Sequence, residues 1–174
     1  GVEQDVEQGV MDFVEALNGT PSQLAIVDFS TNSSIVSGYS GVDQNYIDNF
    51  IFPYLTHDDT PVPGYTGPTY NSVQINSTNW EAALQDVVAV GGADLVIFFT
   101  DGNPTAPNGS ANQQQNLNDA CDEANALKAN GTHLFMLGIG NVEADNLQSI
   151  SDTDVYNGSN ISTADYSLSS DFSQ

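Results

Sequence analysis

The sequence contains no arginine and a single lysine, Lys128, against 23 aspartate and glutamate residues, so its formal net charge is −22 at pH 7. Nucleic-acid phosphates are neutralised by clustered cations, so this composition argues strongly against nucleic-acid binding. Anionic membrane surfaces and phosphorylated ligands are disfavoured for the same reason. The acidic residues are spread between apolar segments rather than gathered in a tail, which is typical of a folded protein in salty or calcium-rich surroundings.

Cysteine is equally scarce, because Cys121 is the only one. A single cysteine excludes an internal disulfide framework, and we expect Cys121 to be a small buried side chain on a helix face. No apolar stretch is long enough to cross a bilayer, and no signal peptide opens the sequence. Any export signal is therefore expected upstream of Gly1. A length of 174 residues is that of one domain with a sizeable core.

Apolar side chains recur with helical and strand periods along the chain. Spacings of three and four residues predict helices over residues 2–17, 42–55, 78–90, 111–130 and 144–150. Short apolar runs bounded by turn residues predict strands over residues 24–29, 34–39, 94–101, 132–139 and 165–168. This alternation indicates an α/β fold with a doubly wound, mostly parallel sheet, one antiparallel edge strand and helices on both faces.

Two residues are expected to mark helix ends. Pro53 should end the helix over residues 42–55, because proline cannot continue a helix without strain. Thr78 stands at the start of the next helix, where its hydroxyl can cap free backbone N–H groups. Residues 56–77 between these helices form a long loop rich in Pro, Gly, Thr and Tyr, and loops of this length are often functional.

Asp101 is the most informative residue, because it closes the apolar run of residues 94–99 at the carboxyl end of a predicted buried strand. Ligands bind at that edge of open α/β sheets. Desolvating a carboxylate without a partner costs free energy, so we expect an interaction that compensates this cost at Asp101. A metal ion, a hydrogen-bonded turn and a substrate are the three interpretations that we consider.

Other motifs give weaker signals. Gly138 and Gly140 are spaced as in a dinucleotide-binding loop, but Glu143 replaces the third glycine. We interpret His133 as structural and His57 as solvated, since neither has a sequence-near carboxylate and nucleophile. The sequence offers no acid–base or nucleophile set, so we expect a protein that is not an enzyme.

Thr78 and Asp101, within residues 77–84 and 99–105, resemble the von Willebrand factor A family, specifically its members in large surface proteins of bacteria. Further similar segments are residues 124–131, 138–141 and 164–172. The resemblance implies a single domain of this type over residues 1–174. It also implies a metal ion-dependent adhesion site at the carboxyl edge of the sheet. The ligands of such a site come from three loops, and Thr78 and Asp101 match those of the second and third loops. Hydroxyl and carboxylate oxygens suit Mg²⁺, Mn²⁺ or Ca²⁺.

The first loop of that site, with the pattern D-x-S-x-S, should precede the helix that begins near Val2. Asp165, Ser167 and Ser169 match the pattern, but no apolar strand leads into them, and we interpret the match as coincidence. We therefore expect the domain to be N-terminally incomplete. Its first, central strand would lie upstream or come from another chain, between the strands at residues 24–29 and 94–101.

The resemblance implies an extracellular or cell-surface adhesion domain that binds a protein or glycan ligand through a divalent cation. The alternative is a structural subunit of a surface filament or sheath in which the metal site is vestigial. The loop of residues 56–77 would border the site. Its residues Tyr65, Pro68 and Tyr70 are candidates for partner contact, although packing within the loop is an equally good interpretation.

Overall fold

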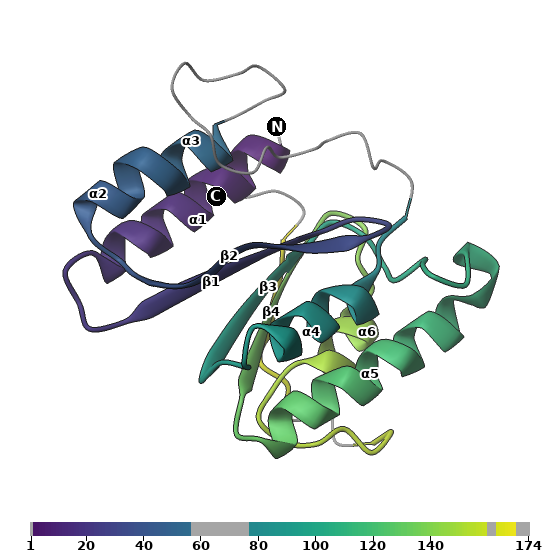
Figure 1. Cartoon of the computed structure of the whole chain (residues 1–174). Coiled ribbons are helices and arrows are strands. Elements are labelled where there is room, and N and C mark those ends of the chain that lie inside the picture. The colour runs from purple at the N-terminus through teal and green to yellow at the C-terminus, as the bar shows by residue number, and fades with distance from the viewer. Residues whose placement is uncertain (1, 57–76, 160–162, 170–174) are drawn as a thin grey trace.

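The computed structural model describes residues 2–56, 77–159 and 163–169, and its elements follow the expected α/β order (Figure 1). The strands are β1 (Gln23–Phe29), β2 (Ser33–Gly41), β3 (Leu95–Thr100), β4 (His133–Ile139) and β5 (Tyr166–Ser169). The longer helices are α1 (Val2–Leu17), α4 (Trp80–Ala89), α5 (Gln113–Ala129) and α6 (Ala144–Ile150). The shorter ones are α2 (Gln44–Tyr46), the π-helix η1 (Ile47–Ile51), α3 (Phe52–Leu55) and the 3₁₀-helix η2 (Ser110–Asn112).

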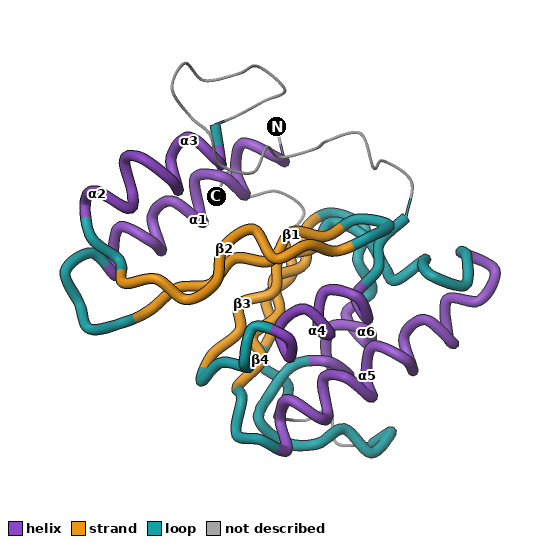
Figure 2. The backbone as a smooth tube through the Cα atoms, in the orientation of Figure 1, coloured by secondary structure: helices purple, strands orange, loops and turns teal. Residues whose placement is uncertain are grey.

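The strands form two sheets. β1 and β2 are an antiparallel pair, whereas β3, β4 and β5 are parallel, in that order. In Figure 2 the hairpin runs across the parallel strands rather than alongside β3. Within the described ranges, nothing pairs with the second edge of β1 or with the edge of β3 opposite β4. The α/β class with parallel strands and an antiparallel strand is as expected, but the sheet is divided between β1 and β3.

Each sheet has its own apolar core. α1 and the α2–α3 stretch pack around Val14, Ile47 and Ile51 next to the hairpin. α4, α5 and α6 pack on the parallel sheet on the opposite side of the molecule (Figure 1). Phe29 of β1 also packs against this second core, with its ring 4.8 Å from that of Phe98. Cys121 is buried on α5, as expected.

Two expectations about helix ends are wrong. The helix does not end at Pro53, which occupies the first turn of α3, where its missing N–H is not required, and the helix continues to Leu55. Thr78 does not cap α4. Asn79 does so, because its side-chain oxygen accepts a hydrogen bond from the Ala82 N–H at 3.1 Å. The capping residue is therefore one position later than expected, and α4 begins at Trp80.

No helix within the described ranges is both long and apolar enough to cross a membrane.

Candidate functional site

The structure brings the loops that carry Thr78 and Asp101 together at the carboxyl edge of the parallel sheet. Asp101 is exposed and follows the last residue of β3, while Thr78 precedes α4. Three hydrogen bonds join the two loops. The Thr78 N–H donates to Thr105 Oγ1 at 2.9 Å, and the Thr78 carbonyl accepts from the N–H groups of Thr105 at 2.9 Å and Ala106 at 3.2 Å. The loops that carry the two residues singled out from the sequence are therefore bonded directly to each other.

The Thr78 hydroxyl lies against Gly102, the residue after Asp101. A Cβ atom built on Gly102 would be 2.7 Å from Thr78 Oγ1, a distance that side chains do not tolerate. Only glycine permits this approach. No hydrogen bond from another described residue engages the hydroxyl, so its oxygen is available beside the Asp101 backbone. No role for Gly102 was predicted from the sequence, although an Asp-Gly pair directly after a buried strand could have indicated a tight turn.

A buried hydrogen-bond chain holds the turn that presents Asp101. The indole N–H of the fully buried Trp80 donates to Thr100 Oγ1 at 3.1 Å, and that hydroxyl donates to the Gly102 carbonyl at 2.9 Å. Trp80 also packs edge-to-face on Phe98 of β3, with ring centroids 5.9 Å apart. Because Trp80 begins α4, the helix that follows Thr78 also positions the turn around Asp101.

The loop after Asp101 is anchored on two further elements. Asn103 Oδ1 accepts hydrogen bonds from the Glu143 N–H at 2.8 Å and from Asn146 Nδ2 at 3.0 Å. On the other side, the buried Asn116 of α5 donates to the Pro104 carbonyl at 3.4 Å. These long-range contacts, which were not predicted from the sequence, place the loop between α5 and α6.

The oxygen atoms gathered here are of the kind that hard divalent cations bind. Thr78 supplies a neutral hydroxyl and Asp101 supplies a carboxylate. Mg²⁺ in proteins commonly keeps several waters and uses only one or two carboxylates, so this donor set fits such an ion in part. The described residues contain no group of three or more His, Cys, Asp or Glu side chains that could hold a metal.

The remaining candidate residues lie away from this site or outside the described ranges. Asp165 Oδ2 is 2.8 Å from His133 Nε2, so the carboxylate that precedes β5 pairs with the histidine at the start of β4. The structural interpretation of His133 stays a prediction, which this contact supports. His57, and the loop residues Tyr65, Pro68 and Tyr70, lie outside the described residues.

Gly138 has a packing role. A Cβ atom there would lie 2.6 Å from Leu147 Cδ1, so the glycine allows α6 to pack closely on β4. This contact explains the first glycine of the motif that resembles a dinucleotide-binding loop.

Comparison with known proteins identifies the domain. The solved structure of proximal thread matrix protein 1 from the mussel byssus superposes with a TM-score of 0.61 at 21% identity, covering 98% of this chain and 39% of that one. At this identity the similarity concerns the fold alone, and the chain spans well under half of that protein. No curated protein matches the sequence. The family model of the von Willebrand factor type A domain matches residues 4–174, and the chain therefore belongs to this family.

Proposed function

We propose that the domain is an extracellular adhesion domain in which a divalent cation, Mg²⁺, Mn²⁺ or Ca²⁺, binds between Thr78 and Asp101. The ion would engage a carboxylate or another oxygen group of a protein or glycan ligand. The observation that carries this proposal is the Thr78 hydroxyl, which lies beside the Asp101 turn without a hydrogen bond to any described residue. Domains of this family generally mediate protein interactions, which agrees with a role in binding.

The charge of the donor set favours a carboxylate ligand. A divalent ion that meets one carboxylate and one neutral hydroxyl keeps an excess of positive charge. In a chain with a net charge of −22, such an ion would create a local positive site on an otherwise acidic domain. A carboxylate of the partner would then replace a water molecule on the ion. No base or nucleophile is required, so we propose a binding function rather than catalysis.

We further propose that an additional strand completes the sheet between β1 and β3. It would come from elsewhere in the same protein or from another chain. In the described ranges the second edge of β1 and the edge of β3 opposite β4 lack partners, and Leu95 of β3 is 46% exposed despite its apolar side chain. Unpaired edges are templates for strand addition. A strand here would join the two sheets and end close to Thr78 and Asp101, where it could supply further oxygen donors.

A structural subunit of a surface filament or sheath is the second candidate function. The unpaired edges support it, and a protein with the same fold is a thread matrix protein of the mussel byssus. In that case the cation would be dispensable and assembly would depend on strand addition.

The test is calorimetric titration of Mg²⁺, Mn²⁺ and Ca²⁺ into the wild-type protein, Asp101→Ala and Thr78→Val, with Asp122→Ala as the control. Asp122 is an exposed carboxylate on α5, away from the site. We expect each site variant to lose at least about tenfold in affinity, because even outer-shell substitutions cost that much. Binding that is equal in all four proteins would contradict the metal proposal. If, in addition, the protein still assembled in excess chelator, the filament function would replace the adhesion function.

A further inference from the structure

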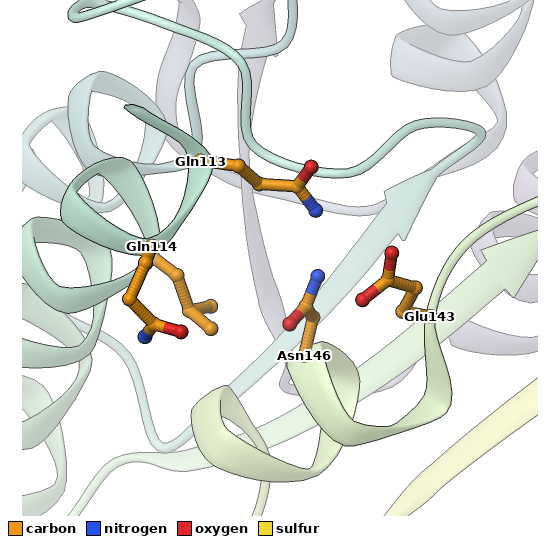
Figure 3. A pocket seen from close by; sticks show the side chains of 5 residues that line it. Gln113, Gln114, Glu143 and Asn146 are labelled. Atoms are coloured by element: carbon orange, nitrogen blue, oxygen red, sulfur yellow. The ribbon is translucent and has the colours of Figure 1, made fainter. Parts of the chain in front are cut away.

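A cavity of approximately 180 Å³ lies between the start of α5 and α6, beside residues that bind the loop after Asp101 (Figure 3). Its lining residues are Gln113, Gln114, Leu117, Glu143 and Asn146. Figure 3 shows the side chains of Gln113, Glu143 and Asn146 directed toward the same space. The cavity thus combines two amides and a carboxylate from two separate elements.

Both walls of the cavity are tied to the loop that follows Asp101. On the α6 side, Asn146 is 6% exposed and its Nδ2 donates to Asn103 Oδ1, which also accepts from the Glu143 N–H. On the α5 side, Asn116 binds the carbonyls of Pro104 and Gly109. These bonds fix the distance between the walls, so the cavity is a formed feature of the carboxyl edge of the sheet.

One of the polar side chains that face the cavity, Asn146, is bonded to Asn103, whereas two others are not engaged by the described residues. Neither the Gln113 amide nor the Glu143 carboxylate has a hydrogen bond with another described residue. Glu143 precedes α6, but its side chain makes no capping hydrogen bond. The two side chains offer a donor, an acceptor and a charged acceptor within one small space.

This chemistry selects against anions and apolar groups. Lys128 is the only lysine or arginine of the chain, and it is buried at 5% exposure. An anionic ligand in the cavity would therefore find no lysine or arginine to pair with. Glu143 repels anions, and Leu117 is the only apolar lining residue. Hydroxyl groups, which both donate and accept, match amides and a carboxylate well. We infer that the cavity binds one neutral sugar residue of a glycan.

The size of the cavity agrees with this ligand. Pockets for drug-sized ligands and cofactors measure roughly 300–1,000 Å³. A cavity of approximately 180 Å³ suits a single ring with its hydroxyl groups. Sugar binding here uses neither Thr78 nor Asp101, so it does not depend on the metal proposal.

The experiment is saturation-transfer difference NMR of the protein with methyl glycosides of glucose, galactose and mannose at millimolar concentration. Glucuronate serves as a charged probe, and acetamide serves as a probe for protein amide side chains. The variants are Gln113→Ala and Glu143→Ala. Gln115→Ala is the matched control, because Gln115 is an exposed glutamine in the same turn of α5 that does not line the cavity.

We expect at least one neutral glycoside to bind the wild-type protein and Gln115→Ala alike, and to bind each cavity variant about tenfold more weakly. Excess chelator should leave the signal unchanged. The proposal is overturned if no glycoside binds, if the cavity variants bind as well as the control, or if glucuronate or acetamide binds in preference. Loss of the signal with chelator would overturn it as well, since the sugar would then lie on the cation.

Discussion

Thr100 shows how one side chain outside the candidate ligand set controls the site. Its hydroxyl accepts from the Trp80 indole and donates to the Gly102 carbonyl, so a single oxygen joins α4 to the turn that carries Asp101. Thr100 is 5% exposed, and water cannot easily replace either partner. The geometry of the site therefore depends on a buried group that would not touch the cation.

Thr100→Val keeps the shape of the side chain but removes this oxygen. We expect a loss of about 1–3 kcal/mol in the free energy of unfolding, because the buried Trp80 N–H is left without a partner. Cation affinity should fall as well. Urea denaturation and calorimetry measure the two effects. Thr100→Ser, which keeps the hydroxyl, should recover most of both, and equal behaviour of the Val and Ser variants would refute this role.

Asp28 provides a pH-dependent prediction. Burial raises the pKa of this β1 carboxyl above its ordinary value of 3.8, although hydrogen bonds from the Phe29 backbone and the Tyr54 side chain oppose the effect. The folded state then binds more protons at Asp28 than the unfolded state does. Its contribution to stability is therefore complete below pH 3.8 and is lost as the pH rises through the raised pKa.

Asp28→Asn removes this titration. The stability of the variant relative to wild type should increase from pH 3.5 to pH 7, measured by urea denaturation across roughly that range. Asp122→Asn, at an exposed position of α5, is the control. For each variant, the free energy of unfolding relative to wild type is compared at the two ends of the pH range. An equal change with pH for Asp28→Asn and Asp122→Asn would contradict the prediction.

At the scale of elements, close packing decides where glycine is needed. Gly138 of β4 faces α6, and a Cβ atom would also lie 3.1 Å from Leu168 Cδ1 and 3.3 Å from Val142 Cβ, in addition to its contact with Leu147. Gly9 of α1, by contrast, has no atom within 4 Å of a Cβ at its position. The same substitution should therefore have opposite effects in the two elements.

Gly138→Ala should destabilise the protein by about 1–3 kcal/mol, because an overpacked side chain forces its neighbours to move. Gly9→Ala should stabilise it by about 0.5–1 kcal/mol, because alanine is the better helix former. Thermal and urea denaturation of both variants test the pair of predictions. A Gly138→Ala variant at least as stable as wild type would show that α6 packs on β4 more loosely than the structure indicates. A destabilised Gly9→Ala variant would contradict the prediction for α1.

At the scale of the whole molecule, the dominant feature is uncompensated negative charge. Lys128 is buried, so the accessible surface carries no lysine or arginine to offset the 23 acidic residues. Mutual repulsion of these carboxylates opposes the compact state. Salt weakens it, because the Debye length falls from about 10 Å at 0.1 M to about 3 Å at 1 M.

We expect the melting temperature at pH 7 to rise steadily as NaCl increases over that range. At pH 3, where most carboxylates are protonated, the same salt series should have a much smaller effect. Differential scanning calorimetry at both pH values provides the measurement and its control. An equal salt response at pH 3 and pH 7 would mean that charge repulsion is not the cause.

The sequence by itself determined the order and type of the elements, because apolar periodicity records which face of each segment is buried. It also located Asp101, since an acidic residue at the end of an apolar strand is visible locally, and the resemblance to a family added Thr78. Pro53 and the cap of α4 were mispredicted. The place of Pro53 depended on helical geometry, because proline fits the first turn of a helix. At the start of α4, the side chain of Asn79 rather than that of Thr78 accepts the capping hydrogen bond.

Only the tertiary structure decided which distant side chains meet. The Trp80–Thr100–Gly102 chain and the bonds of Asn103 to residues of the α6 region join segments 20 to 43 positions apart. The division of the sheet between β1 and β3, and the polar cavity between α5 and α6, are likewise properties of the assembled fold. A periodic pattern reports burial within one segment, whereas the partner of a buried group depends on how the segments pack.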